Sequence, residues 1–152
     1  MLGVLVQANF SGTLSVLGVR IQRDKALAGV SERADQGPGN SCMIVVAIDC
    51  ALDARQLTRV ARRAIFGLGR TGADFAGSSG DYAIAFATGD GAAAPESSLE
   101  PIFAAVQEAV DEAVLNSLFM AVTTVGHLGH TRYAVPSDFV VRACRDAGVL
   151  GS

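Results

Sequence analysis

Residues 37–48, GPGNSCMIVVAI, set a Gly-Pro-Gly-Asn turn and one serine directly before a continuous apolar run. The run from Cys42 to Ile48 is short and rich in β-branched residues, which favours a strand covered on both faces. Asp49 ends it. Ser41 therefore stands between a turn and a core strand. Two interpretations are open: an ordinary strand start, or a hydroxyl that a rigid strand holds for chemistry.

The rest of the chain carries further strand and helix patterns. Alternating or apolar segments predict strands over residues 3–9, 14–21 and 82–88. Apolar residues in steps of three and four predict helices over residues 54–68, 99–122 and 137–147. The expected fold is an α/β layered domain with three or four strands and long helices on a sheet face. It lacks the regular βαβ alternation of a doubly wound fold.

Residues at the helix ends support these boundaries. Asp53 is a candidate N-cap for the first helix, and Ser97 or Ser98 is one for the second. Pro101 is tolerated because it lies in the first helical turn. Gly148 is expected to close the last helix.

The helix predicted over residues 54–68 has two contrasting faces. Its expected core residues are Leu57, Val60, Ala61, Ala64 and Ile65. Its other side carries Arg55, Arg59, Arg62 and Arg63. Such a cluster is either a solvated face or an anion site, and the solvated face is the more common case.

Composition excludes several classes of protein. Half of the 152 residues are hydrophobic and 18% are charged, which excludes a disordered chain and predicts one domain over residues 1–152. The net charge of −3 gives no basic field for nucleic acid. The apolar runs fall short of the ~20 residues that a membrane span needs. The first residues also lack the pattern of a secretory signal.

The three cysteines, Cys42, Cys50 and Cys144, form an odd number without a CxxC pair. They are expected to be free thiols in a reducing compartment, and the cytoplasm is the expected location.

Two motifs that suggest other chemistry do not hold up. The glycine-rich stretch over residues 67–81, GLGRTGADFAGSSGD, lacks the GK[ST] ending of a phosphate loop and the setting of a dinucleotide fingerprint. His127 and His130 form an HxxH pair without a third ligand nearby, so no metal is expected. A Ser-His-Asp triad stays open, although no GxSxG elbow marks its nucleophile.

Ser41 could become a self-activating nucleophile. The polar connection over residues 23–40 is expected to be an exposed, cleavable loop. If the Asn40–Ser41 bond were cut, Ser41 would carry a free amine, and such amines titrate at about 7.7 to 8.0. A neutral amine can act as base for the hydroxyl of its own residue. The cut itself could use the same oxygen, by attack of Ser41 Oγ on the Asn40 carbonyl and hydrolysis of the resulting ester.

Several blocks together resemble one family of enzymes. They are GVLVQANF at residues 3–10, the long block from GNSCMIVVAIDC to GLGRTG at 39–72, SSGDYAIAFAT at 78–88, EAVLNSLFMA at 112–121 and GHTRYAVP at 129–136. The chain is similar over nearly its whole length to the β-peptidyl aminopeptidases and L-aminopeptidase/D-esterases. These are N-terminal-serine hydrolases whose precursor cuts itself into two subunits.

The resemblance implies a role for each matching residue. Ser41 corresponds to the nucleophile, freed by cleavage after Asn40. Asn9 corresponds to an asparagine that binds the oxyanion. Ser79 and Asp81 correspond to a relay to the nucleophile, with Asp81 standing where some members carry Glu. The backbone N–H of Gly80 is a further candidate for the oxyanion site.

The resemblance also implies a fold, a reaction and a subunit organisation. The family fold is an αββα sandwich related to the N-terminal-nucleophile hydrolases. Residues 1–40 would be the end of an α-subunit and residues 41–152 a β-subunit, without the family's long N-terminal segment. An isolated chain of this kind is expected to expose an apolar sheet face and to be poorly active.

The implied substrates are small peptides and amino-acid amides or esters, with no metal or organic cofactor. The family tends toward tetramers, so a homo-oligomer is expected, with no nucleic-acid or membrane partner. Two alternatives remain. One is a non-catalytic fragment or pseudoenzyme that acts as a binding or assembly module. The other is an ornithine acetyltransferase-like acyltransferase, although that branch uses threonine as its nucleophile.

Overall fold

A three-stranded mixed sheet forms the centre of the molecule. The computed structural model describes residues 1–26, 28 and 40–151. The sheet order is β1-β4-β5, with β1 at Leu2–Phe10, β4 at Asn40–Ile48 and β5 at Tyr82–Ala87. β4 is antiparallel to β1 and parallel to β5. The strands predicted over 3–9, 42–48 and 82–88 are therefore confirmed within two residues at each end.

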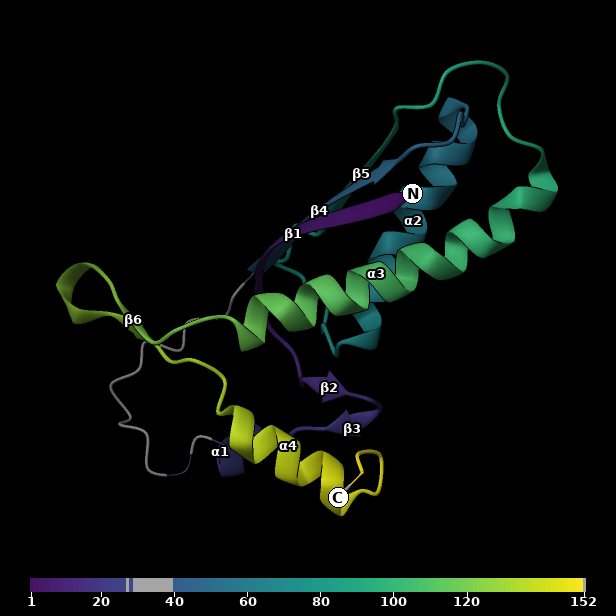
Figure 1. Cartoon of the computed structure of the whole chain (residues 1–152). Helices are drawn as coiled ribbons and strands as arrows, with labels where there is room; N and C mark the ends of the chain where they lie inside the picture. Colours follow the sequence, from purple (N-terminus) through teal and green to yellow (C-terminus); the bar gives the residue numbers. More distant parts are fainter. Residues whose placement is uncertain (27, 29–39, 152) are drawn as a thin grey trace.

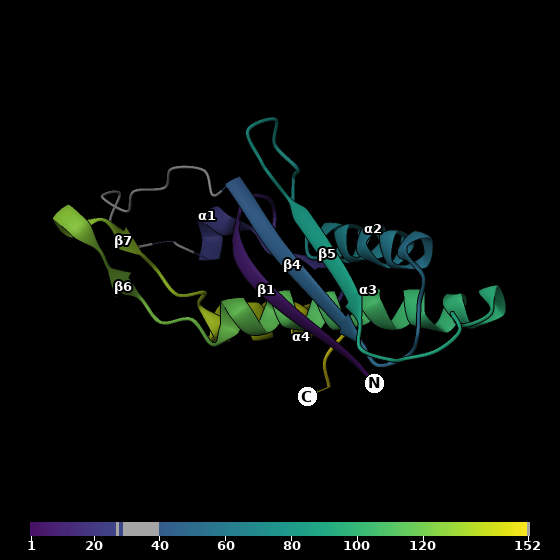
Figure 2. The ribbon, with the colours of Figure 1, turned by 90° about the horizontal axis from the view of Figure 1, so that it is seen from above.

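Two long helices cover one face of this sheet. They are α2 (Ala54–Arg70) and α3 (Leu99–Phe119), and Figure 2 looks onto the sheet with both helices behind it. The core between the layers is built from alternate residues of β4 and one stripe of each helix. Its fully buried members are Cys42, Ile44, Val46, Val60, Ala64, Leu68, Val106, Val110 and Val114. Of the core residues predicted for α2, Val60 and Ala64 are buried, whereas Leu57, Ala61 and Ile65 are half-buried.

The opposite face of the sheet is open. Leu5 of β1 is 71% exposed, Met43 of β4 is 38% exposed and Ile84 of β5 is 58% exposed. The expectation that β4 is covered on both faces is therefore wrong for the described chain. Both long helices pack on the same side, so the apolar run has one buried face and one open face. The expected exposure of an apolar sheet face is confirmed.

A second, smaller packing unit lies beyond one end of the sheet (Figure 1). The sequence predicted one strand over residues 14–21, and this was wrong: β2 (Ser15–Val16) and β3 (Val19–Arg20) form a tight hairpin. The turn between them has positive φ at Leu17 (51°) and Gly18 (80°). An alternating pattern gives no sign of that reversal, because Leu rarely adopts positive φ.

The hairpin packs on the C-terminal helix α4 (Ser137–Asp146) around buried Ile21, Val140 and Cys144. α4 ends near the predicted residue 147, and Gly148 follows it with φ of 73°. A short helix, α1 (Arg23–Ala26), follows the hairpin. Most of the predicted cleavable loop over residues 23–40 thus lies outside the described residues.

A protruding hairpin joins α3 to α4 (Figures 1 and 2). It consists of β6 (Thr124–Val125) and β7 (Thr131–Arg132), with the single 3-10 turn η2 (His127–Gly129) at its tip. α3 therefore ends at Phe119, three residues before the predicted end at Val122. The last turn tightens as the Ala121 N–H donates to Leu118 O at 3.4 Å, and β-branched residues then carry the chain into the hairpin.

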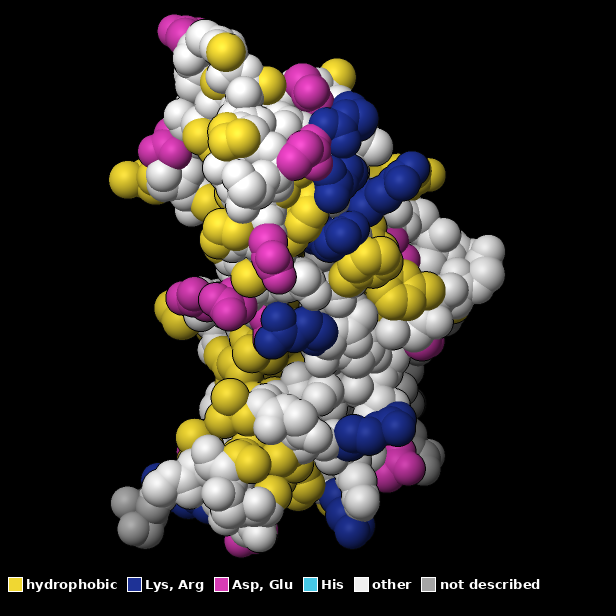
Figure 3. All heavy atoms as spheres, turned by 90° about the vertical axis from the view of Figure 1, so that its right-hand side faces the viewer, with side chains coloured by type: hydrophobic (Ala, Val, Ile, Leu, Met, Phe, Trp, Pro, Cys, Tyr) yellow, Lys and Arg dark blue, Asp and Glu magenta, His cyan; other side chains and the backbone are white. Residues whose placement is uncertain are grey.

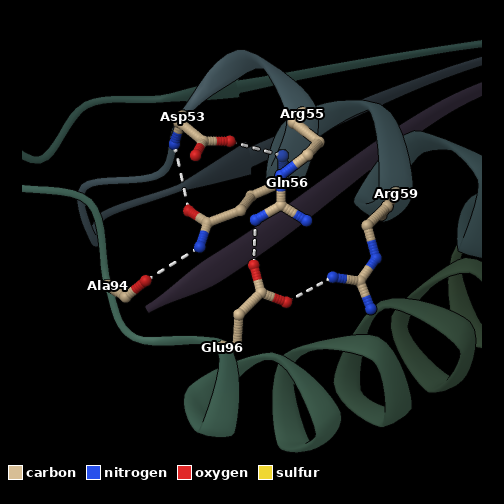
Figure 4. Close-up of polar contacts among 6 residues, drawn as sticks. All are labelled: Asp53, Arg55, Gln56, Arg59, Ala94 and Glu96. Atoms are coloured by element: carbon tan, nitrogen blue, oxygen red, sulfur yellow. Dashed lines mark hydrogen bonds and ion pairs between the residues drawn. The ribbon is translucent and has the colours of Figure 1, made fainter.

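The ends of α2 and α3 are formed differently. Asp53 caps α2 as predicted, since its carboxylate accepts from Gln56 N at 2.7 Å while the Gln56 side chain accepts from Asp53 N at 3.1 Å (Figure 4). The Gln56 amide also donates to Ala94 O at 2.8 Å. Ser98 occupies the N-cap of α3 but makes no side-chain cap bond, because the turn η1 (Glu96–Ser98) leads directly into the helix.

Several arginines of α2 contact other groups of the chain. Arg55 and Arg59 pair with Glu96, the latter at 2.5 Å (Figure 4). Arg63 stacks on the Phe103 ring of α3 with its guanidinium 4.4 Å from the ring centre. Figure 3 shows several basic side chains gathered in a band beside acidic and apolar ones, with other basic side chains lying apart from it. These contacts favour the solvated-face interpretation, and the two arginines lower the pKa of the Glu96 carboxyl.

Three further expectations can be compared with the described residues. Cys42, Cys50 and Cys144 are all free thiols. Within residues 1–26, 28 and 40–151, no three His, Cys, Asp or Glu side chains are grouped so as to hold a metal ion. The described helices also include none that is both long and apolar enough to cross a membrane.

Candidate active site

Ser41 and Asn9 are neighbours across two strands. The antiparallel register of β1 and β4 pairs Asn9 with Ser41, and directly opposite residues have Cβ atoms about 4.5–5.5 Å apart. Side chains alternate along a strand, so both residues lie on the open face, while Cys42 and Ala8 turn toward the helices. The hydroxyl of Ser41 and the amide of Asn9 thus share one end of the open face.

The register that creates this pair is set by the core. Cys42, Ile44 and Val46 are fully buried against the helices. A slip of one residue would bury Ser41 and expose these three residues. The apolar run of β4 therefore fixes the side to which the serine hydroxyl points.

A loop from the end of α2 reaches the same place. It covers residues 71–81 and leads into β5. Asp81 Oδ1 accepts a hydrogen bond from the backbone N–H of Cys42 at 2.9 Å, and its Oδ2 accepts one from Ser79 Oγ at 2.7 Å. One carboxylate therefore ties the hydroxyl of Ser79 to the strand that begins beside Ser41.

Gly80 brings backbone close to the Ser41 hydroxyl. A Cβ atom built at Gly80 would lie 3.6 Å from Ser41 Oγ and 3.0 Å from Cε2 of Tyr82. The absence of a side chain thus leaves room beside the hydroxyl. A larger residue would press on the Tyr82 ring or on the space next to Ser41 Oγ.

The thiol next to Ser41 does not compete with it. Cys42 is fully buried, and burial first, then the charge of Asp81, raises the pKa of its thiol to about 11. The thiol is therefore neutral at physiological pH and packs as a small apolar group. Ser41 is the residue at this strand end that can present a nucleophilic oxygen to the open face.

The five residues named from the sequence thus meet at one sheet end, from three separate segments. β1 supplies Asn9, β4 supplies Ser41, and the loop before β5 supplies Ser79, Gly80 and Asp81. A hydroxyl, an amide donor, a hydroxyl–carboxylate pair and a close backbone segment are the groups that acyl transfer needs. Asn40, the residue before the predicted cleavage point, begins β4 opposite Phe10.

Sequence reasoning missed two residues near this site. Ser11 Oγ donates to both carboxylate oxygens of Asp74, at 3.1 and 3.0 Å. The only local signal was an aspartate in a glycine-rich turn, which is common in any loop. The link to Ser11, 63 positions away, is a tertiary contact that local pattern does not reveal.

Other features that could form a site are a histidine pair and two surface hollows. His127 and His130 lie in the protruding hairpin between α3 and α4. One surface hollow is lined by residues that include Lys25, Pro136 and Arg142, and another by residues around Gly72, including Arg20. Neither hollow includes Ser41 or Asp81 in its lining, and the second includes Ser11 and Asp74.

Comparison with known proteins places the chain in context. Residues 1–132 match the model of Peptidase family S58. A curated relative, the β-peptidyl aminopeptidase BapA of Sphingosinicella xenopeptidilytica, is 33% identical over 164 residues, covering 92% of this chain and 41% of the relative. The chain spans about two fifths of the length of the curated relatives it matches.

Solved structures agree with this match. The PH0078 protein of Pyrococcus horikoshii OT3 has a TM-score of 0.84 and 38% identity, covering 98% of this chain and 43% of that one. The L-aminopeptidase D-Ala-esterase/amidase of Ochrobactrum anthropi has a TM-score of 0.85 and 28% identity, covering 99% and 44%. That enzyme is described as a variant of the Ntn hydrolase fold. The expected layered fold of this type is therefore confirmed.

Proposed function

This chain belongs to peptidase family S58, and we propose that it carries the nucleophile of a self-processing serine aminopeptidase. The proposed reaction releases N-terminal residues from small peptides, amides or esters. One observation carries the proposal: Asp81 bonds both to Ser79 Oγ and to the Cys42 N–H, beside the Ser41–Asn9 pair. The family match and the names of the relatives support the class of reaction.

The proposed nucleophile is Ser41 Oγ. Cleavage of the Asn40–Ser41 bond gives Ser41 a free α-amine, whose ordinary pKa of about 7.7 to 8.0 leaves part of it neutral at pH 7. This amine takes the hydroxyl proton as Oγ attacks the substrate carbonyl. The tetrahedral intermediate collapses to an acyl-enzyme on Ser41, and the released amine or alcohol carries the proton away. Water then attacks the ester while the Ser41 amine takes its proton, and the proton returns to Ser41 Oγ as the acid is released.

The oxyanion is proposed to sit between Asn9 and Gly80. The Asn9 side chain lies across the ladder from Ser41, so its amide N–H can donate to an oxygen bound next to Oγ. The backbone N–H of Gly80 is the second proposed donor, since that residue lies beside Ser41 Oγ. Loss of one such donor in other enzymes costs about 3–4 kcal/mol of activation energy.

Ser79 and Asp81 are proposed to orient the nucleophile. The Asp81 carboxylate fixes the rotamer of Ser79 through the 2.7 Å bond. It also holds the backbone at Cys42, one residue from the nucleophile. Ser79 can then pass a proton between the Ser41 amine and the leaving group.

The open apolar face of the sheet supports the presence of a further layer in the active protein. Leu5, Ile84 and Phe86 are 71%, 58% and 44% exposed and lie beyond Ser41 on the same side of the sheet. We propose that a second layer covers this face in the active protein and completes the αββα sandwich and the substrate pocket. Activity, substrate range and a tetrameric assembly belong to that complete form.

Intact-mass measurement tests the proposal. Cleavage after Asn40 divides this chain into 40 and 112 residues, since 152 − 40 = 112. We expect the active protein to show this cut and to hydrolyse amino-acid p-nitroanilides and esters. Ser41→Ala should remain whole and inactive. A wild-type protein that stays uncut, or a Ser41→Ala variant that hydrolyses these substrates at the wild-type rate, would contradict the proposal.

A further inference from the structure

We propose that Ser11 and Asp74 are positioning residues for this site. The bond between their side chains, called here the Ser11–Asp74 clasp, fixes the loop of Ser79 and Asp81 against the strand end that carries Asn9. This inference rests on the proposed function, because it concerns how that site is held in register. Neither residue is proposed to touch the substrate.

The clasp joins two segments that each carry a proposed site residue. Ser11 follows the end of β1, two positions after Asn9, and Asp74 lies in the loop after α2. Ser11 Oγ donates to Asp74 Oδ1 at 3.1 Å and to Oδ2 at 3.0 Å. The Asp74 N–H donates back to Ser11 O at 3.1 Å. Three contacts therefore hold one residue pair in a defined orientation.

From Asp74 the contacts continue to the relay. Asp74 Oδ1 also accepts from Ala76 N at 3.3 Å, and Ala76 O accepts from Ser79 N at 2.7 Å. Ser79 Oγ donates to Asp81, whose other oxygen accepts from the Cys42 N–H. These contacts thus run from the end of β1, the strand of Asn9, through the loop to β4, the strand of Ser41. Because these two strands are paired at Asn9 and Ser41, the contacts form a closed ring.

Backbone contacts fix the loop as far as Asp74. A Cβ atom at Gly12 would lie 2.0 Å from Gly72 O, and one at Gly72 would lie 1.9 Å from Thr13 O. The Thr13 N–H also donates to Gly72 O at 3.0 Å. These close approaches leave the loop no freedom before residue 73. Beyond that point, the bond from Asp74 N to Ser11 O fixes the backbone as far as Asp74, and the Asp74 carboxylate adds a side-chain anchor on Ser11 Oγ.

The residue after Asp74 has a backbone conformation that neighbouring contacts must hold. Phe75 has φ of 48°, in the left-handed region that non-glycine residues seldom occupy. Such a conformation persists where neighbouring contacts hold it. The Asp74 side chain bridges this residue by accepting from Ala76 N on its far side. Asp74 and Phe75 are exposed and Ser11 is half-buried, so loss of the clasp leaves the core untouched.

Amide hydrogen exchange tests whether the clasp positions the relay. The variants are Ser11→Ala and Asp74→Ala, with Ser11→Thr as the conservative variant that keeps the hydroxyl. Asp90→Ala, an exposed aspartate in the loop after β5, is the control. We expect exchange at the Ser79 and Cys42 amides to accelerate in both alanine variants and to stay at the wild-type rate in Ser11→Thr and the control. Unchanged exchange at Cys42 in Asp74→Ala overturns the inference.

Steady-state kinetics on an amino-acid p-nitroanilide test whether the positioning matters. In the active protein we expect kcat to fall about 10- to 100-fold in both alanine variants while KM stays within about twofold. Ser11→Thr should restore most of the rate. An unchanged kcat, or a rise in KM alone, overturns the inference.

Ser41→Ala measured in parallel separates the two proposals. If Ser41→Ala is inactive while Asp74→Ala keeps the wild-type kcat, only the clasp assignment fails. If Ser41→Ala itself keeps the wild-type rate, the proposed function fails.

Discussion

The two faces of the β1-β4-β5 sheet differ in what covers them and in the residues they present. On the covered face, Ile44 and Val46 of β4 are buried between α2 and α3. On the open face, the same strand presents Ser41 and half-exposed Met43. Alternation along one strand thus separates residues that pack in the core from residues that line the open face. Substitutions on the two faces should therefore have separable effects, on stability or on rate.

The largest expected effect is on rate, from the open face. Asn9→Ala removes the proposed oxyanion donor, and kcat should fall by about 10²- to 10³-fold. Unfolding by urea should change little, because the Asn9 side chain is exposed. Gln7→Ala, the preceding residue on the same face of β1, is the control and should keep its rate. Equal rate losses in the two variants would show that Asn9 has no role that Gln7 lacks.

The next effect is on stability, from the covered face. Ile44→Ala opens a cavity in the fully packed core and should lower the free energy of unfolding by about 2–5 kcal/mol. Leu5→Ala on the open face is the matched comparison, and urea titration of this chain should show a cost below about 1 kcal/mol. Equal losses would mean that the open face is covered in solution.

Two glycines extend the comparison of the packed side of the sheet with its open face. An added Cβ at Gly67 would lie 3.0 Å from Val110 Cβ and 3.1 Å from Gln107 O, where α2 meets α3. Gly67→Ala should therefore destabilise the protein by about 1–3 kcal/mol, despite the better helix propensity of alanine. Gly3→Ala meets nothing within 4 Å. Its melting temperature should stay within a few degrees of the wild type.

The smallest effect is a pH dependence from the covered side of β4. The folded pKa of Cys42, about 11, lies above its ordinary value of 9.0. Its contribution to stability is therefore fully present below about pH 9 and is lost as the pH rises toward 11. Between pH 8 and pH 10, the unfolding free energy should fall more in the wild type than in Cys42→Ala. Parallel pH curves would show that the thiol does not take part.

Iodoacetamide gives a second readout of the same difference. In the folded protein at pH 8, half-exposed Cys50 should be alkylated, while buried Cys42 should react only after unfolding. Rapid labelling of Cys42 in the native protein would contradict its placement on the covered face.

The parts of the fold with a local cause were predictable from sequence. The core stripes of α2 and α3 follow from helical spacing, and the start of α2 follows from the N-cap Asp53. The hairpin at residues 15–20 was not, because it depends on a positive φ at Leu17. The prediction that β4 is covered on both faces was wrong, because an apolar run does not reveal how many layers cover a strand.

The candidate site was predictable to a different extent. The resemblance to a known family identified the candidate site residues Asn9, Ser41, Ser79 and Asp81. Local pattern alone favoured ordinary turns at these positions. Residue pattern cannot show that Asp81 reaches the N–H of Cys42, 39 positions away. The same holds for Ser11 and Asp74, whose link depends on the tertiary fold.

The pairing of β1 with β4 has a consequence for a chain cut before Ser41. Eight residue pairs, from Leu2 with Ile48 to Asn9 with Ser41, join the two pieces by one continuous ladder, and β5 pairs with β4 along its other edge. The break would leave the native assembly intact, so the nicked molecule would migrate as a single species until denaturant is added. Renaturation would then require two molecules to find each other. Its rate would depend on protein concentration, whereas an unbroken chain would refold at a rate independent of dilution.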